Sequence, residues 1–287
     1  MTAISVDEEL DDEPDAPAKQ FLRWTGSKRA LVSELLKLVP ADFGTYHEPF
    51  LGSGALFFAL QPKRGAVLSD LNTRLTRTFV AIKSDLDAVL TPLRVYAEMY
   101  AVHGPAFYMH ARDAVNVDEM TSPELAAWFV FMNKTGFNGI YRVNASGKYN
   151  VPSGKFARPP TICDEPVLRA CSAALLHATV INSDFREVER RAVMGDFVYL
   201  DSPYIPVSKS ADFTAYTAAG FGPAEQTALR DLALRLKHRG VHVLLSNSDT
   251  PITRELYQGF EIRSITRSGG MNSNVTKRGR VGELLIR

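Results

Sequence analysis

The chain has 287 residues, of which 45% are apolar, 10% aromatic and 23% charged, a profile typical of a soluble globular protein. Its apolar runs fall far short of the ~20 residues that a membrane span requires, which excludes a transmembrane protein. Two cysteines can form neither a disulfide framework nor a zinc site, and the six histidines are scattered without ligand spacing. The N-terminus lacks the basic segment and apolar core of a secretory signal. We therefore expect a cytoplasmic protein without a metal ion.

The net charge of +1 conceals an acidic N-terminus. Residues 1–18 contain seven acidic residues and no Lys or Arg, so the rest of the chain has a net charge of +8. An acid-rich segment with two prolines and little apolar surface to bury predicts a disordered tail over residues 1–18. The basic body that follows favours a polyanionic partner such as a nucleic acid.

Strands and helices alternate from residue 19 onwards. The apolar spacing predicts helix 28–40, strand 44–50, helix 55–60 and strand 66–69. Gly52 and Gly54 separate the first strand from the following helix, and Asp70 ends the second strand. This order of strand, glycine turn, helix and strand is a βαβ unit.

Residues 73–135 interrupt this alternation with helical patterns. The predicted helices are 74–101, 105–115 and 123–133, the last with Ser122 as N-cap and Pro123 at its first position. Two β-like runs, 139–143 and 148–151, then predict a hairpin around an Asn-Ala-Ser-Gly turn.

The alternation resumes after Val180. The predicted elements are strand 196–201, helix 225–239, strand 241–246 and the closing strands 260–264 and 281–287. We therefore expect an α/β sheet that carries one inserted helical domain.

The first candidate site is the glycine turn together with Asp70. Glycines between a strand and a helix allow backbone amides to approach a ligand closely. Asp70 lies 18 residues beyond Gly52, where open α/β folds use a carboxylate to bind ribose hydroxyls. The missing third glycine argues against a dinucleotide and favours a nucleoside without a pyrophosphate. Taken alone, a tight turn followed by an aspartate explains this motif equally well.

The second candidate site is Asp201-Ser202-Pro203-Tyr204, at the carboxyl end of a buried strand. The carboxylate can accept a hydrogen bond from an exocyclic amino group, a turn carbonyl can accept the other proton, and Tyr204 can stack on the ring. Taken alone, a turn that ends a strand and half-buries a tyrosine is the better explanation.

Taken together and in this order, the motifs resemble those of the Dam-like (D12 class) family of DNA adenine-N6 methyltransferases. The resemblance extends from Phe21 to Arg287. The segments that carry it are Phe21–Lys28, Glu48–Gly54, Ser69–Asn72, Phe137–Asn144, Tyr149–Gly154, Asp184–Phe185, Asp201–Tyr204 and Leu245–Asp249. In one departure, Ser202 replaces the first proline of the family's Asp-Pro-Pro-Tyr tetrapeptide. We expect this change to loosen the turn and slow the chemistry without removing a contacting side chain.

The resemblance implies a Rossmann-like methyltransferase fold with a mixed seven-stranded sheet and S-adenosyl-L-methionine (AdoMet) as methyl donor. The implied reaction is methyl transfer to N6 of an adenine flipped out of duplex DNA, without a metal. Residues 19–72 and 179–287 would form the catalytic AdoMet-binding domain. Residues 73–178 would form a helical target-recognition domain with its hairpin at about 137–155. Because the hairpin matches the Dam pattern, GATC is the expected recognition sequence.

The resemblance also assigns site residues. The catalytic residues are Asp201, Pro203 and Tyr204. The cofactor-binding residues are Trp24, Lys28, Glu48, Pro49, Phe50, Gly52, Gly54, Asp70, Asp184, Phe185 and Asp201. The DNA-binding residues are Phe137, Asn138, Arg142, Asn150 and Lys155. Asp201 and the carbonyl of Ser202 or Pro203 are expected to accept both amino protons of the adenine.

Two other functions stay open at this stage. An RNA or protein-glutamine methyltransferase can use a similar tetrapeptide, and a DNA-binding relative that has lost catalysis would explain Ser202. The inserted helices and hairpin favour an enzyme that reads duplex DNA. We expect a monomer that acts on DNA at the nucleoid. A separate cognate restriction endonuclease is a candidate partner, and a phage-borne or orphan regulatory role is the alternative.

Overall fold

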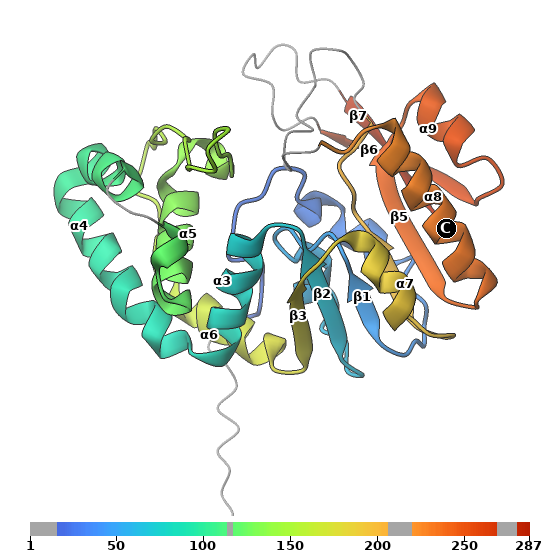
Figure 1. Cartoon of the computed structure of the whole chain (residues 1–287), viewed down its shortest axis with the longest axis horizontal. Helices are drawn as coiled ribbons and strands as arrows, with labels where there is room; N and C mark the ends of the chain where they lie inside the picture. The colour runs from blue at the N-terminus through green and yellow to red at the C-terminus, as the bar shows by residue number, and fades with distance from the viewer. Residues whose placement is uncertain (1–15, 114–116, 206–219, 269–279) are drawn as a thin grey trace, which may run out of the picture.

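The computed structural model describes residues 16–113, 117–205, 220–268 and 280–287, so most of the tail predicted to be disordered lies outside the described residues. Its centre is a seven-stranded sheet of order β3-β2-β1-β4-β5-β7-β6 (Figure 1). The strands are β1 (Tyr46–Glu48), β2 (Ala66–Asp70), β3 (Ala178–Asn182), β4 (Phe197–Leu200), β5 (His242–Ser248), β6 (Ile262–Ser268) and β7 (Arg280–Ile286). β7 runs antiparallel to both of its neighbours, whereas the other pairings are parallel. The predicted mixed seven-stranded sheet is therefore confirmed.

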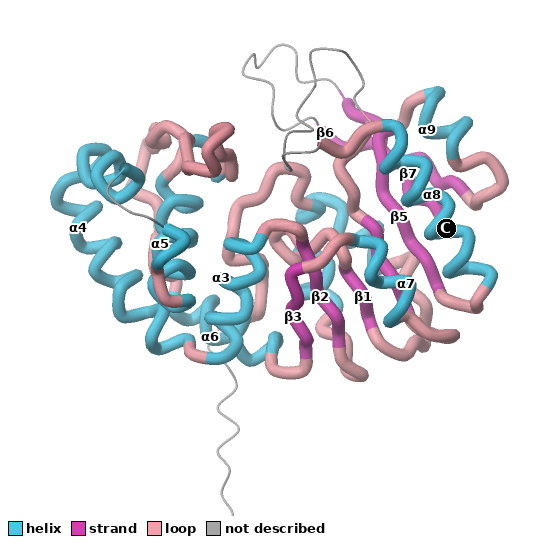
Figure 2. Tube along the Cα trace, viewed as in Figure 1, coloured by secondary structure: helices cyan, strands magenta, loops and turns pink. Residues whose placement is uncertain are grey.

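The helices are α1 (Val32–Leu36), α2 (Ala55–Leu60), α3 (Thr73–Ser84), α4 (Leu86–Asp113), α5 (Ser122–Thr135), α6 (Glu165–Leu175), α7 (Val188–Arg191), α8 (Pro223–His238) and α9 (Pro251–Leu256). In Figure 2, α7 and α8 lie across the face of the sheet that is turned toward the viewer. Helices α3 to α6 form a separate group beyond the edge strand β3 (Figure 1). Within the described ranges, no helix is long and apolar enough to cross a lipid bilayer.

The sheet separates two apolar cores, because successive side chains of a strand point to opposite faces. Along β4, Phe197 and Tyr199 join the core that contains α2, whereas Val198 and Leu200 join the core beneath α8. The first core continues into the helical group, where Trp128 of α5 is fully buried. Helices α3 to α6 therefore share one continuous core with the sheet. The assignment of residues 73–178 as a separate target-recognition domain stays a prediction.

The helical segments differ from the predicted ones at their boundaries. The predicted helix 74–101 is two helices, because Asp85 leaves helical geometry and its Oδ1 accepts a hydrogen bond from Ala88 N at 3.3 Å. The expected break near residue 104 is a kink inside α4, where Gly104 adopts φ 53°. The N-cap of α5 is Thr121 rather than Ser122, and Thr121 N donates to Glu124 Oε2 at 3.0 Å.

The predicted hairpin is irregular. Its two arms run antiparallel, but they pair only through the isolated bridges Gly136↔Ser153 and Val143↔Tyr149. A turn closes them, with Asn144 N donating to Lys148 O at 2.8 Å. We call residues 136–154 the reading loop, after the role that the resemblance predicts for them. In Figure 1 it lies above α5, at the end of the molecule toward which the parallel strands run.

Candidate active site

The candidate site residues meet at one edge of the sheet. Because β3, β2, β1, β4 and β5 are parallel, their carboxyl ends share this edge, where ligands bind in open α/β sheets. Glu48 ends β1, Asp70 ends β2 and Asp201 directly follows β4. Residues up to 153 positions apart in the chain are thus brought to neighbouring strand ends.

The glycine turn is held by Asp70. Asp70 Oδ2 accepts from Gly52 N at 3.1 Å, and Oδ1 accepts from Asn72 N at 2.9 Å. Gly52 has φ 48°, and a Cβ added there would lie 2.8 Å from Cδ1 of Trp24. Position 52 therefore requires glycine for both its backbone conformation and the close approach of the indole ring.

Trp24 links this turn to the reading loop. Its ring stacks on Tyr141 of the loop, with centroids 6.1 Å apart, and on Phe129 of α5 at 6.3 Å. The side chain of Asn133 bonds to both backbone groups of Arg23 and donates to Gly139 O at 3.0 Å. The segment with Arg23 and Trp24, the glycine turn and the reading loop thus pack against one another.

Asp201 is the centre of the second candidate site. The Lys28 ammonium lies 2.7 Å from Oδ1, and Ser246 Oγ donates to the same oxygen at 2.8 Å. Burial raises the pKa of Asp201, while Lys28 and the Ser246 hydroxyl oppose that rise. The Lys28 side chain is only 6% exposed, so this ion pair is largely withdrawn from water.

Tyr204 is fixed at both its ring and its hydroxyl. The Lys28 ammonium lies over the ring, 4.5 Å from its centroid, which is a cation–π contact. The hydroxyl donates to Glu283 Oε2 of β7 at 2.9 Å. Lys28 therefore contacts both Asp201 and Tyr204, the charged and the aromatic members of the tetrapeptide.

Glu48 is a buried carboxyl group with a displaced pKa. Tyr46 donates to Glu48 Oε2 at 2.9 Å, and Pro49 and Phe50 continue the chain toward the glycine turn. Burial raises the pKa of Glu48 from 4.5 to about 8, because the surroundings disfavour its charged form. Near neutral pH this carboxyl group is therefore mainly protonated.

We expect Glu48→Gln to flatten the pH dependence of stability. Between pH 5 and 8 the folded protein holds a proton on Glu48 that the unfolded chain has released, so the free energy of unfolding falls as pH rises. The variant cannot titrate and should lose less stability over this interval. Chemical unfolding at several pH values measures the effect, with Glu34→Gln as control because the pKa of Glu34 is lowered by its hydrogen bond to Lys37. Parallel profiles for wild type and Glu48→Gln would contradict the assignment.

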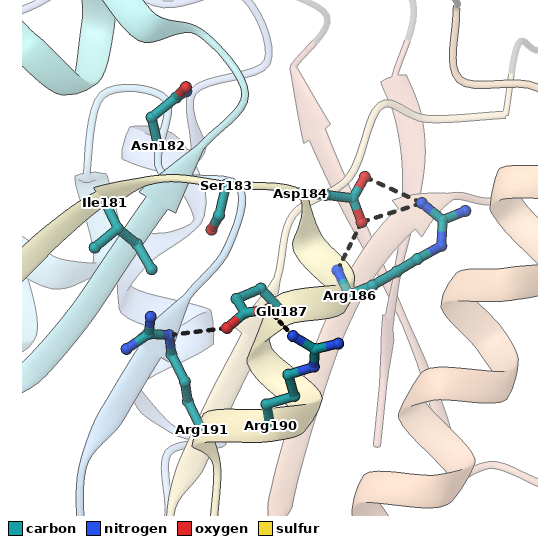
Figure 3. Close-up of a pocket in the computed structure, with 8 residues that line it drawn as sticks. All are labelled: Ile181, Asn182, Ser183, Asp184, Arg186, Glu187, Arg190 and Arg191. Carbon is teal, nitrogen blue, oxygen red and sulfur yellow. Dashed lines mark hydrogen bonds and ion pairs between the residues drawn. The ribbon is translucent and has the colours of Figure 1, made fainter.

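Asp184 and Phe185 follow β3, and Asp184 lines an open cavity of about 770 Å³ (Figure 3). The Asp184 carboxylate accepts from Arg186 N at 2.9 Å and pairs with the Arg186 guanidinium at 3.0 Å. Phe185 is buried, stacks on Phe50 with centroids 5.3 Å apart, and has the Arg186 guanidinium 4.4 Å from its ring centre. Phe50 and Phe185 are therefore one aromatic pair, and Arg186 contacts both Asp184 and Phe185, two of the predicted cofactor-binding residues.

The DNA-binding candidates lie in or beside the reading loop. Phe137 is 46% exposed, and its exposed neighbour Asn138 has φ 54°. Arg142 is fixed by Asn150, since Nε donates to Asn150 Oδ1 at 2.8 Å and an Nη donates to Asn150 O at 3.1 Å. Lys155, just beyond the loop, is exposed.

The sequence interpretation overlooked two polar residues near Asp201 and Tyr204, Gln226 and Glu283, both almost fully buried. Ser246, which lies in the motif segment Leu245–Asp249, was given no role, and it is buried as well. Gln226 could have been identified from the sequence, because it is a polar residue on the same helical face as the apolar Leu229 and Ala233. Asn247, which the motif series included, is buried beside them, whereas Asp249 pairs with Arg254 at 2.8 Å. No group of three or more His, Cys, Asp or Glu side chains suited to a metal ion occurs in the described part of the chain.

Comparison with known proteins gives a family and named relatives. The family model for D12 class N6 adenine-specific DNA methyltransferases matches residues 24–270. The chain is 35% identical to the type II methyltransferase M1.LlaDCHI of Lactococcus lactis subsp. cremoris, over 93% of this chain and 94% of that protein. It is 33% identical to the type II methyltransferase M.MjaIII of Methanocaldococcus jannaschii, over 93% and 98% of the two chains. It is 31% identical to the DNA adenine methylase of Haemophilus influenzae, over 95% and 94%.

These matches cover the glycine turn, the reading loop and the Asp201 turn in a single alignment. They confirm the resemblance drawn from the motifs. A methyltransferase of this kind takes its methyl group from AdoMet and acts on DNA. The chain belongs to the D12 class N6 adenine-specific DNA methyltransferase family.

Proposed function

We propose that this protein is a site-specific enzyme that transfers a methyl group from AdoMet to N6 of an adenine flipped out of duplex DNA. The observation that supports this most strongly is the environment of Asp201. Its carboxylate is anchored through one oxygen by Lys28 and Ser246, directly after β4, which pairs with the strand that leads into the glycine turn. A fixed carboxylate can accept a hydrogen bond from an amino group, and the neighbouring glycine turn is of the kind that binds a nucleoside. Together they suit methylation of an amino group.

Buried carboxyl groups fit a cationic methyl donor. Burial raises the pKa of Glu48, Asp70 and Asp201, so a cation bound among them would stabilise their charged forms. AdoMet carries a positively charged sulfonium and, when bound, supplies an electrophilic methyl group. Asp70 would bind the ribose hydroxyls, and Gly52 would allow close backbone approach. The remaining cofactor residues of the proposal are Trp24, Lys28, Pro49, Phe50, Gly54, Asp184 and Phe185.

The target amino group needs two acceptors, because its lone pair is delocalised into the adenine ring. Lys28 and Ser246 both contact Oδ1 of Asp201, so we assign Oδ2 to one amino proton. The carbonyl of Pro203 already accepts from Gln226 Nε2 at 2.7 Å, so we assign the Ser202 carbonyl to the other. Accepting both protons draws N6 toward tetrahedral geometry and makes its lone pair available. Positioning then supplies most of the rate enhancement. Asp201 stabilises the positive charge that develops on N6 as the sulfonium becomes a neutral thioether, and the extra proton on N6 is then lost along its hydrogen bond to Asp201 Oδ2.

Tyr204 would hold the flipped base. A base inside duplex DNA cannot reach a buried site, so it must leave the stack before it reacts. The Tyr204 ring has the Lys28 ammonium on one face, and we propose that the adenine stacks on the other. Phe137 and Asn138 would fill the space that the base leaves in the duplex, and Lys155 would contact a phosphate.

Arg142→Ala should relax sequence selectivity at one base pair. The guanidinium is held by Asn150 with its planar fork pre-formed, which suits bidentate recognition of a guanine in the major groove. We expect discrimination at that position to fall by about 1–3 kcal/mol. Competition between duplexes that differ at single positions measures the effect, with Lys148→Ala of the same loop as control. Uniform weakening over all sequences would instead identify a phosphate contact.

A methylation assay with labelled AdoMet tests the proposed function directly. Duplex DNA with GATC sites, the same duplex without them, RNA and a glutamine-containing protein serve as parallel substrates. We expect label in N6-methyl-2′-deoxyadenosine from the GATC duplex, because the reading loop matches the Dam pattern. Label in RNA or protein alone would refute the proposal. Activity that appears only after Ser202→Pro would identify a catalytically weakened relative.

A further inference from the structure

A network of buried amide groups holds the turn that carries Asp201. Gln226 of α8 donates from Nε2 to Pro203 O at 2.7 Å, and its Oε1 accepts from Asn247 Nδ2 of β5 at 3.1 Å. Asn247 Oδ1 in turn accepts from Ile205 N at 3.1 Å. Ser248 Oγ donates to Ile205 O at 2.7 Å. The backbone after Asp201 is therefore fastened to two different elements of the fold.

Both amide side chains of this network are buried, where a polar group without hydrogen bonds would destabilise the fold. Gln226 is 4% exposed and Asn247 is fully buried. A buried amide destabilises a protein unless its donors and acceptors are satisfied. Here Gln226 and Asn247 bond to each other and to the turn, and Asn247 Oδ1 also accepts from Ser248 N at 2.8 Å. Their polar atoms are therefore satisfied when residues 203–205 follow the observed backbone path.

The turn itself lacks one local source of rigidity. Ser202 stands where the resemblance places a proline, so its φ is not fixed by a ring. Pro203 restricts Ser202 to extended conformations but does not lock it. The Ser202 hydroxyl is buried and makes no hydrogen bond to any described residue, so it does not anchor the turn either.

We propose that Gln226 is a positioning residue for methyl transfer, with Asn247 as its support, and that it supplies the rigidity that Ser202 does not. This inference depends on the proposed function, because it assigns Asp201 and Tyr204 to the target base. Gln226 touches neither reacting group. It acts by occupying the Pro203 carbonyl and fixing the peptide between the carboxylate and the aromatic ring.

The test compares four proteins: wild type, Gln226→Met, Ser202→Pro and the double variant. Met keeps the length of the side chain but removes both polar atoms, and an error of about 1 Å in position can cost about 100-fold in rate. We expect the single-turnover rate with duplex DNA to fall about 10- to 100-fold in Gln226→Met, with AdoMet affinity unchanged. Ser202→Pro alone should have little effect, and in the double variant it should restore most of the lost rate.

Two further variants separate positioning from general stability. Gln258→Met is the matched control, because Gln258 is exposed in the turn after α9. Gln226→Glu keeps an acceptor for Asn247 but loses the donor to Pro203 unless the new carboxyl group is protonated. Its rate deficit should therefore narrow as pH is lowered, relative to wild type at the same pH. Thermal unfolding of each variant at each assay pH measures general stability separately, so a rate deficit in fully folded protein reports positioning.

The outcomes distinguish the inference from the proposed function. A rate for Gln226→Met equal to that of the Gln258→Met control would overturn the inference while wild type still methylates adenine. A deficit that Ser202→Pro leaves undiminished would also overturn it. Absence of N6-methyladenine with wild type would refute the proposed function itself.

Discussion

Asp201→Ala is expected to abolish methyl transfer, with a rate at least about 1,000-fold below wild type. The variant removes the acceptor that localises the lone pair of the target nitrogen and stabilises its developing charge. Duplex DNA should still bind, and AdoMet affinity should fall far less than the transfer rate, because the glycine turn, Asp70 and the reading loop lie on other elements. Single-turnover kinetics with saturating DNA and AdoMet measures the loss separately from binding.

Asp201→Asn is the matched comparison for this variant. Asp201→Ala leaves the buried Lys28 ammonium without its carboxylate, which destabilises the site for reasons unrelated to catalysis. The amide keeps the volume and one acceptor while losing the charge, so thermal unfolding should distinguish the two. If either variant lost AdoMet affinity as severely as transfer, Asp201 would belong to the cofactor site alone.

Asp70→Ala should mainly weaken AdoMet binding. The carboxylate holds Gly52 N and Asn72 N, and the proposal gives it the ribose hydroxyls as well. Loss of two charge-assisted hydrogen bonds should cost about 3 kcal/mol or more of binding free energy, roughly 150-fold in Kd. Titration calorimetry with AdoMet measures this, and Asp42→Ala, an exposed carboxylate paired with Arg64, is the control.

Asp70 and Asp201 have different proposed roles: Asp70 binds AdoMet, and Asp201 acts on the target base. At AdoMet concentrations far above the raised Kd, Asp70→Ala should recover much of its methylation rate, whereas Asp201→Ala should not. Equal loss of AdoMet affinity in the two variants would contradict the separation between a donor site and a target-base site.

The parallel part of the fold was largely predictable from the sequence. Strands with continuous apolar runs, such as 196–201, end in acids, and this pattern indicates buried strands with polar carboxyl ends. The interpretation did not identify β3 or α6. β3 is an edge strand with several half-exposed side chains, so the run 178–182 is not uniformly apolar. Short helices such as α9 have too few turns to show a periodic pattern.

The site was predictable only in part. The carboxylates and glycines lie in contiguous motifs, so the resemblance could identify them. Their partners come from distant segments: Glu283 contacts Tyr204 from 79 residues away, and Ser246 contacts Asp201 from 45 residues away. The choice between the Ser202 and Pro203 carbonyls needed the position of Gln226, which only tertiary structure supplies.

The most direct test of the account is the structure of the protein with duplex DNA and a non-reactive AdoMet analogue. We expect a flipped-out adenine stacked on Tyr204, with its amino group within hydrogen-bond distance of Asp201 Oδ2 and the Ser202 carbonyl. The analogue should lie against the Gly52 turn and Asp70, facing that amino group. An adenine still paired in the duplex, or an analogue bound far from Asp201, would contradict it.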